Sequence, residues 1–137
     1  MNFKELKKFM KDAGWGNLAT TDGKVVGVRP VSGWEWFGKE IWCATRKSSD
    51  KVKQLKKVSY AEYCFCDKEG RHVRLGGPST ISTDNDEKLK LYKSLPELAK
   101  YIQNPVSPAY VVIKTKPKRI RFMAADDMEY KEVKIGS

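Results

Sequence analysis

"LATTDGKVVGVRPV", residues 18–31, contains the clearest strand and turn pattern of the chain. Two runs rich in apolar and β-branched residues flank Asp22-Gly23, a dipeptide typical of the turn between two antiparallel strands. Pro30 has no backbone N–H, which limits how far the second strand can pair in the middle of a sheet. The stretch therefore predicts a β-hairpin whose second strand lies near a sheet edge.

Most of the chain on either side also has the patterns of short strands. The segments expected to form strands are 16–32 around the hairpin, 32–45 as a further pair or bulged hairpin, 59–67, 71–83, and 109–123 with a break at Pro117. Strands at this close spacing are typical of a β-barrel or β-sandwich. The fold class is therefore mainly β, as one domain over residues 1–137, with a peripheral tail at 124–137.

Helical spacing of apolar residues appears in only a few places. Residues 2–13 are predicted to form an N-terminal helix that Gly14 ends, and Ser49 to Lys57 a short basic helix. The acid-rich start of residues 84–95 predicts a third helix, and Pro96 opens another short one directly after it. These helices decorate the β framework.

The composition and net charge of the chain indicate which classes of binding partner are favoured. The chain has 137 residues, enough for one core, and a formal charge of +10 from 27 Lys and Arg against 17 Asp and Glu. This excess favours anionic partners without choosing among nucleic acid, phosphate-bearing molecules and membrane surfaces. No apolar run reaches the roughly 18 residues that a membrane span needs, and the N-terminus lacks the apolar core of a signal peptide. We therefore expect a cytoplasmic protein that does not enter a membrane.

The stretch "ATRKSSDKVKQLKK", residues 44–57, is the strongest indication of a binding site. It places hydroxyls and cations around the predicted N-terminus of a helix, where free backbone N–H groups and a partial positive charge favour a phosphate. An ordinary serine cap on a solvated basic helix explains the same residues. The later lysines, Lys53, Lys56 and Lys57, are expected to form the solvated face.

Other chemistry is sparse in the sequence. It has one histidine, no GxGxxG and no phosphate-loop motif, and its paired acids near residue 84 are better explained as helix caps. Cys43, Cys64 and Cys66 are expected to be free thiols that pack as small hydrophobes, since zinc-knuckle spacing is absent, so no metal site is predicted. If the protein is an enzyme, a cofactor is expected to carry the reactive atoms.

Taken together, "LATTDGKVVGVRPV", "IWCATRKSSDKVKQLKK", "RHVRLGG" and "SPAYVVIKTKPKRIRF" resemble, in order and spacing, the pyridoxamine-phosphate-oxidase-like flavin-binding split barrels, in particular their general-stress-protein branch. The resemblance implies a six-stranded antiparallel split β-barrel with a short helix between strands 3 and 4 and a helical pair before the last strands. It also implies a homodimer with FMN at the subunit interface.

The resemblance carries over residue by residue onto ten positions. One arginine of the family's second strand approaches the phosphate or the isoalloxazine, a strand-end and helix-start element holds the phosphate and ribityl chain, and a Gln-Val-Arg pattern from the partner faces the flavin. The matching cofactor-binding residues are Arg29 with Pro30 and Val31; Thr45, Arg46, Lys47, Ser49 and Lys51; and His72, in place of the glutamine, with Arg74.

The resemblance leaves the reaction open. The arginine and histidine motif with which the true oxidase holds pyridoxine phosphate is missing after the last strand, so oxidation of that substrate is not expected. Similar barrels bind deazaflavin or haem, and some bind no cofactor. Three hypotheses follow: an FMN-dependent oxidoreductase acting on an unidentified small molecule, a flavin-binding stress or storage protein without catalysis, and a less favoured basic β-barrel that binds nucleic acid. No catalytic residue is assigned.

Overall fold

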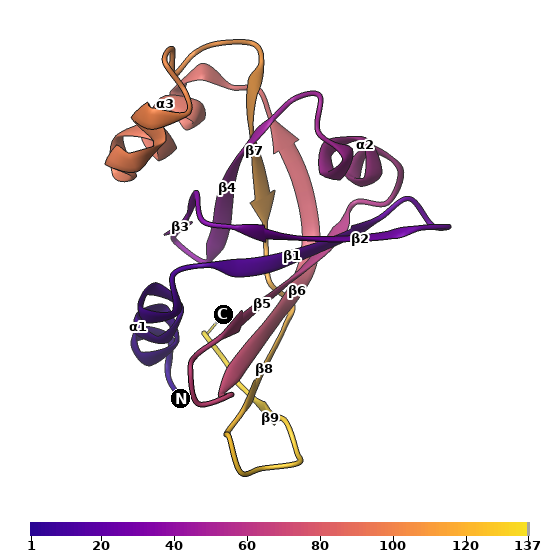
Figure 1. Cartoon of the computed structure of the whole chain (residues 1–137), viewed down its shortest axis with the longest axis vertical. Helices are drawn as coiled ribbons and strands as arrows, with labels where there is room; N and C mark the ends of the chain where they lie inside the picture. The colour runs from indigo at the N-terminus through magenta and orange to yellow at the C-terminus, as the bar shows by residue number, and fades with distance from the viewer. Residues whose placement is uncertain (137) are drawn as a thin grey trace.

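The protein is a strongly curled antiparallel sheet with helices on its outside (Figure 1). The computed structural model describes residues 1–136. Its helices are α1 (Phe3–Ala13), α2 (Asp50–Lys57), α3 (Asn85–Ser94) and the 3₁₀ helix η1 (Pro96–Lys100). Its strands are β1 (Gly16–Thr21), β2 (Val26–Val31), β3 (Trp34–Phe37), β4 (Glu40–Arg46), β5 (Tyr60–Cys66), β6 (His72–Ser82), β7 (Tyr110–Thr115), β8 (Arg119–Met123) and β9 (Lys131–Glu132).

The predicted hairpin is confirmed as β1 and β2, which pair in register from Gly16 with Val31 to Thr21 with Val26. The Asp22 carboxylate holds the turn, because it accepts hydrogen bonds from the backbone N–H groups of Lys24 and Val25, both at 2.8 Å. The main path of the sheet runs β2-β1-β5-β6-β7-β4-β3, so β2 is an edge strand. The position of Pro30 in the sheet agrees with the prediction.

The longest strand, β6, joins the two halves of the barrel. Its residues 72–78 pair with β5, while its later residues 79–82 pair with β7, and the sheet bends between the two parts. Gly77 lies at this bend, where a Cβ atom would meet the backbone oxygen of Lys116 at 2.0 Å. Only glycine fits such a close approach of two backbones.

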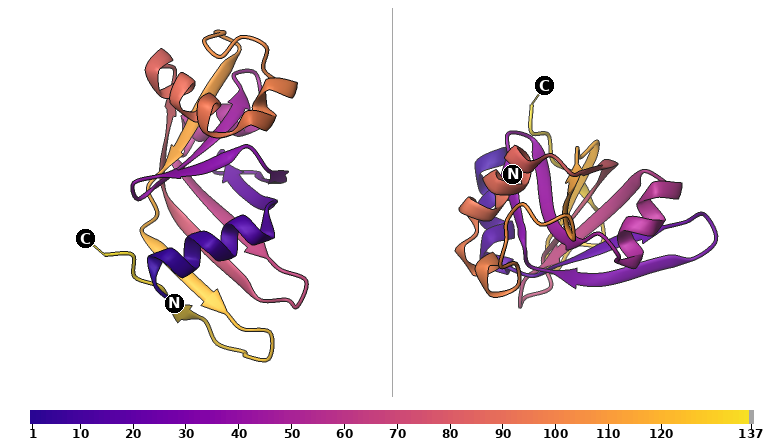
Figure 2. Two further views of the ribbon diagram at one scale, coloured as in Figure 1. Left: turned by 90° about the vertical axis from the view of Figure 1, so that its left-hand side faces the viewer. Right: turned by 90° about the horizontal axis from the view of Figure 1, so that it is seen from above.

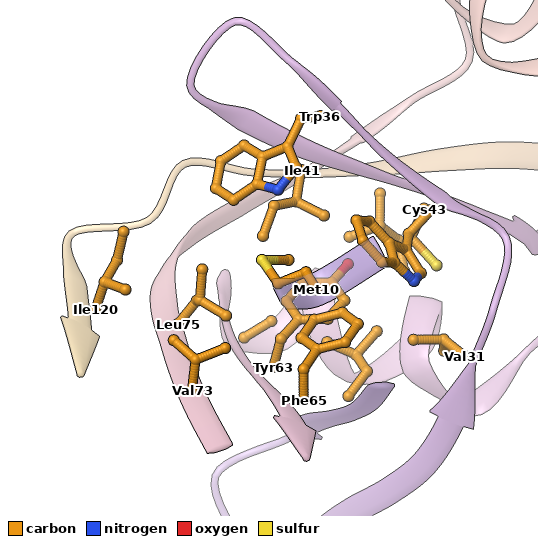
Figure 3. Packing of buried hydrophobic residues seen from close by; sticks show 14 of the residues in the cluster. Met10, Val31, Trp36, Ile41, Cys43, Tyr63, Phe65, Val73, Leu75 and Ile120 are labelled. Atoms are coloured by element: carbon orange, nitrogen blue, oxygen red, sulfur yellow. The ribbon is translucent and has the colours of Figure 1, made fainter. Parts of the chain in front are cut away.

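The barrel interior is filled by side chains from almost every strand and from α1 (Figure 3). Tyr63 and Phe65 of β5 lie near the middle of this cluster and have no exposed surface. The Trp34 ring meets the Phe65 ring edge-on, with centroids 4.8 Å apart. Met10 closes the cluster from α1, so the helix seals one end of the barrel.

Two helical units lie on the same side of the sheet, α1 at one end and α3 with η1 at the other (Figure 2). The Asn2 side chain caps α1 in a reciprocal box with Glu5. A second apolar cluster fills the space between α3, η1 and the outer face of β4 and β7, and it includes Trp42, Leu91 and Leu98. This cluster fixes η1 and the chain that follows it beside the end of β4.

The split-barrel architecture agrees with the expectation, and the details differ. The described residues form nine strands because Gly38, at φ +59°, makes β3 and β4 two separate strands, and because β8 and β9 form late in the chain. The short helix therefore follows the fourth strand rather than the third. The segment expected to be a peripheral tail contributes β9 and places Val133, 7% exposed, in the core. No helix in residues 1–136 is both long and apolar enough to cross a bilayer.

Candidate functional site

A pocket of about 1260 Å³, here called the main pocket, opens where β2 and β4 end and α2 begins. One wall comes from these strand ends and the start of α2, and the opposite wall comes from η1 and the chain between η1 and β7. The first wall consists of Pro30–Gly33, Ala44–Ser49, Lys51, Lys53 and Lys56; the second consists of Glu97, Leu98, Tyr101–Asn104, Ser107, Ala109 and Tyr110, with Trp15 at the rim.

Seven of the ten predicted cofactor-binding residues line this one pocket. They are Pro30, Val31, Thr45, Arg46, Lys47, Ser49 and Lys51. The hairpin and the strand-to-helix element are separate in the sequence, and the paired sheet brings their ends together. The structure therefore brings together the segments 30–31 and 45–51, while the ligand itself stays a prediction.

The start of α2 is open toward the pocket. Ser49 is the N-cap residue, yet its side chain makes no capping hydrogen bond, and its hydroxyl lies 3.3 Å from the Thr45 hydroxyl. The first-turn N–H groups are thus not occupied by the serine, and two hydroxyls lie beside them. This arrangement can donate several hydrogen bonds to one anion.

Lys51 is the half-buried cation of the first turn. Burial lowers the pKa of its ammonium, and the nearby positive charge of Arg29 lowers it further, while Asp50 and Cys43 oppose this. A positive group that is partly desolvated and next to another cation gains stability when an anion arrives. The local electrostatics therefore favour binding of a negative group beside Lys51.

Arg29 lies behind this wall rather than in it. Its guanidinium donates hydrogen bonds to the Leu18 carbonyl at 3.2 Å, to the Thr20 hydroxyl at 2.6 Å and to Gln54 of α2 at 3.3 Å. Gly27 leaves the space for this path, because a Cβ there would lie 2.4 Å from an Arg29 nitrogen. In the single chain Arg29 thus supports α2 and raises the positive potential near Lys51.

The second wall is held by a buried lysine of α3. Lys88 is 2% exposed; its ammonium donates to the Ser107 carbonyl at 2.6 Å, and its own carbonyl accepts from the Tyr110 hydroxyl at 3.0 Å. The Lys47 backbone N–H in turn donates to the Ala109 carbonyl at 2.8 Å. Burial and the charge of Lys47 lower the pKa of Lys88. The two walls are therefore tied together through the backbone of residues 107–110.

His72 and Arg74 do not line the main pocket of their own chain. They lie at the start of β6, where the His72 ring is 2.8 Å from the Tyr130 hydroxyl and Arg74 pairs with Glu62 at 2.9 Å. Tyr130 belongs to the tail, so β9 and the turn before it fix these two side chains. Their role toward a cofactor stays a prediction that depends on a second subunit.

Several pocket residues were not predicted. Trp15, 63% exposed, and Tyr101, 77% exposed, supply aromatic surface at the pocket. By contrast, Trp34, Trp36 and Trp42 are all buried in the two apolar clusters, so none of them is available to stack on a ligand. Lys53 and Lys56, expected to be only a solvated face, also border the pocket. A tryptophan between two glycines, Gly14 and Gly16, is the sequence feature that could have indicated Trp15.

The cysteines differ from one another. Cys43 is buried, and burial raises the pKa of its thiol to about 11, so it packs as a small hydrophobe as predicted. Cys64 is half-buried and Cys66 is exposed, on the strand face away from the core, so the prediction of burial is wrong for Cys66. All three thiols are free, and no group of three or more metal-ligating side chains gathers within residues 1–136.

The sequence and the fold are both similar to those of known proteins. A sequence model of the pyridoxamine 5'-phosphate oxidase family matches residues 3–124. No curated protein matches the sequence. A NimC/NimA family protein from Clostridium acetobutylicum is similar in structure, with a TM-score of 0.81, 19% identity, and coverage of 94% of this chain and 89% of that one.

Two further solved structures share the fold. A protein from Clostridium acetobutylicum that is related to general stress protein 26 has a TM-score of 0.81 and 18% identity, over 96% of this chain and 93% of that chain. A pyridoxamine 5'-phosphate oxidase-related, FMN binding protein from Nostoc punctiforme has a TM-score of 0.71 and 15% identity, over 93% of this chain and 84% of that chain. At these identities the similarity shows the fold.

Proposed function

Because the chain belongs to the pyridoxamine 5'-phosphate oxidase family, we propose that its main pocket binds FMN and that the protein is an oxidoreductase acting on a small molecule. The observation that carries the proposal is the convergence of Thr45, Ser49 and Lys51 on the uncapped start of α2, at one end of a pocket that also has apolar and aromatic surface. A structural relative is described as an FMN binding protein, which supports the same cofactor.

The residues present fit the two ends of such a molecule. The hydroxyls of Thr45 and Ser49 and the Lys51 ammonium suit a phosphate dianion, as hydrogen-bond donors plus positive charge. Val31 and Tyr101 line the same pocket and suit a flat apolar ring system. Bound FMN would supply hydride-transfer chemistry. The protein would supply binding, orientation and a positive potential.

The main alternative is a flavin-binding protein without turnover, and deazaflavin is the alternative cofactor. The absence of an assigned acid or base in the main pocket does not separate catalysis from storage, because the cofactor supplies the reactive atoms. Turnover of reduced nicotinamide with an added acceptor distinguishes the two functions. Equal titrations with FMN and with a deazaflavin distinguish the two cofactors.

The direct experiment is an absorbance spectrum of the protein after incubation with FMN and desalting. We expect flavin bands at about one per subunit, together with a rise in the thermal midpoint, because a ligand that binds only the folded state stabilises it. Complete loss of flavin on desalting with no thermal shift would contradict the proposal.

The affinity for FMN is expected to begin to fall at a lower alkaline pH than it would if Lys51 had the pKa of an ordinary lysine. In the free protein the pKa of Lys51 lies below its usual 10.5, and a bound phosphate raises it, so binding takes up a proton between the two values. The affinity for FMN is therefore at its maximum when the pH is below the lowered pKa of Lys51, and it declines as the pH rises through that pKa. Titrations from neutral to alkaline pH, with riboflavin as the reference that lacks phosphate, measure this.

Lys51→Arg is the matched variant, because an arginine stays protonated throughout this range. We expect its FMN-to-riboflavin affinity ratio to stay flat at alkaline pH, while that of the parent falls. Parallel curves for the parent and the variant would place the titrating group elsewhere.

We also propose that two chains form a homodimer that covers the open side of the main pocket. Val26 and Val28, 68% and 64% exposed, lie on one face of the edge strand β2, and Pro30 continues this face to the pocket. Trp15 extends the apolar surface at the rim. An apolar strip of this kind on an edge strand is a site for association. A second copy would also bring a His72 and an Arg74 that their own pocket does not use.

Val28→Lys is expected to weaken self-association at least tenfold, since it places a charge in the middle of this strip. Analytical ultracentrifugation across a concentration series measures the dissociation constant. Val25→Lys is the control, because Val25 is 60% exposed and belongs to the turn rather than to β2. Equal effects of the two substitutions, or a monomeric parent, would contradict an interface on β2.

A further inference from the structure

A second pocket of about 650 Å³ lies on another part of the molecule and shares no residue with the main pocket. It is bounded by the connection between β7 and β8 with the start of β8, residues 116–120, and by the chain in and after β9, residues 132–136, with Lys39 from the β3–β4 turn. We call it the tail groove. Its volume lies in the range of small-molecule sites, about 300–1,000 Å³.

The backbone on both sides of the tail groove is fixed. The N–H groups of Lys116 and Lys118 donate to the carbonyls of Pro78 and Gly76, at 3.0 and 2.8 Å. The Lys116 carbonyl lies against Gly77 so closely that no Cβ would fit there. On the other side, the Val133 N–H donates to the Ile120 carbonyl at 2.9 Å. The groove is therefore a preformed feature of the barrel end.

The charge of the tail groove is strongly one-sided. Lys116, Lys118, Arg119 and Lys134 are exposed around it, and their side chains form no hydrogen bond or ion pair with any other residue in 1–136. Among the residues of 1–136 that line the groove, Glu132 is the one with a carboxylate side chain. Four exposed cations around one small cavity produce a local positive potential that attracts anions.

The groove also offers apolar surface between these charges. Pro117 and Ile135 are partly exposed within it, and Ile120 and Val133 lie beneath, at 5% and 7% exposure. Such apolar surface does not contribute to binding inorganic phosphate, because that ion is bound through hydrogen-bond donors and positive charges. Cations at the edges around an apolar floor suit a ligand with both properties.

We propose that the tail groove is a second ligand site, which binds an organic anion: a carboxylate, sulfonate or phosphate group carried on an apolar body. The acid group lies among Lys116, Lys118 and Lys134, and the apolar body packs on Pro117 and Ile135. The site is independent of the flavin proposal, because it uses none of the residues of the main pocket.

The test is a titration of FMN-saturated protein with naphthalene-2-sulfonate, followed by amide chemical shifts in NMR. FMN occupies the main pocket, so the probe reports the remaining sites. We expect saturable shifts of the amides of Lys118 and Val133, whereas neutral 2-naphthol at the same concentrations gives shifts at least tenfold weaker. Probe shifts that do not saturate, or that leave both segments of the groove unchanged, would overturn the proposal. If FMN does not bind, the same titration is run on the free protein and the location of the shifts decides.

Substitutions in the groove test the charges. Lys116→Ala with Lys134→Ala is expected to weaken the probe about tenfold, while Lys24→Ala with Lys93→Ala removes equal charge elsewhere and changes affinity less than twofold. Glu132→Gln removes the one opposing charge and is expected to strengthen binding two- to threefold. Equal weakening by both double variants would show that only net charge acts and that there is no site. No change with Glu132→Gln would show that the anion does not bind beside this carboxylate, and it would also overturn the proposal.

Discussion

Replacing both Arg46 and Lys51 by alanine is expected to abolish practical FMN binding, with a loss of roughly 100-fold or more in affinity. Each side chain lines the main pocket beside the start of α2, and a hydrogen bond to a charged group contributes about 1.5–3 kcal/mol. Because Arg46 is exposed and screened by water, we take the lower end of that range for it. Fluorescence titration with FMN measures the loss.

Two comparisons make this result specific to the phosphate. The parent protein should bind riboflavin, which lacks the phosphate, more weakly than it binds FMN. The double variant should bind riboflavin and FMN about equally well. Lys24→Ala with Lys57→Ala removes the same charge from residues outside the pocket lining and should change FMN affinity less than about threefold. A double variant at residues 46 and 51 that retains FMN as well as the parent would move the phosphate site elsewhere.

Phe65→Ala is expected to lower the free energy of unfolding by about 3–5 kcal/mol, which is a large part of the stability of a domain of this size. Phe65 has no exposed surface, and its ring packs against those of Trp34 and Tyr63. Gly16 packs directly on the same ring, since a Cβ there would lie 2.4 Å from it. The strands at the two sides of this ring cannot close the cavity left by alanine.

Urea unfolding followed by tryptophan fluorescence measures this difference. Tyr101→Ala is the matched aromatic control, because Tyr101 is 77% exposed, and its removal should change the free energy of unfolding by about 0.5 kcal/mol or less. A loss of less than about 1 kcal/mol for Phe65→Ala would mean that the barrel interior is not packed around this ring.

The fold could be predicted because its decisive signals are local. Asp22-Gly23 between two apolar runs, the helical spacing in residues 3–13 and Pro117 between two strands each determine structure within a few residues. The tail was harder to interpret. Val133 becomes core only because β9 pairs with β8, a contact that depends on the whole barrel edge and leaves no pattern in two residues of strand.

In the candidate site, too, the local features could be predicted from the sequence and the features that depend on distant contacts could not. The strand end and helix start at 45–51 form a continuous segment, so the sequence could indicate them as one unit, and the structure places them on one wall. The opposite wall could not be predicted, because Lys88 and the chain at 107–110 meet only when α3 packs on β7. The orientation of Arg29 toward α2 was equally hidden, since it depends on the space above Gly27.

The double use of β6 has a consequence for the order of folding. Its first half pairs with β5, the strand directly before it in the sequence, and its second half pairs with β7. β7 in turn pairs with β4, and more than sixty residues separate these two strands in the sequence. The first half can assemble from neighbouring segments, whereas the second must wait until distant segments meet, and closing so long a loop is slow. Both walls of the main pocket are therefore expected to form late, because Thr45 and Arg46 at the end of β4 pair with Val111 and Tyr110 of β7. The β5–β6 part of the barrel is expected to form before them.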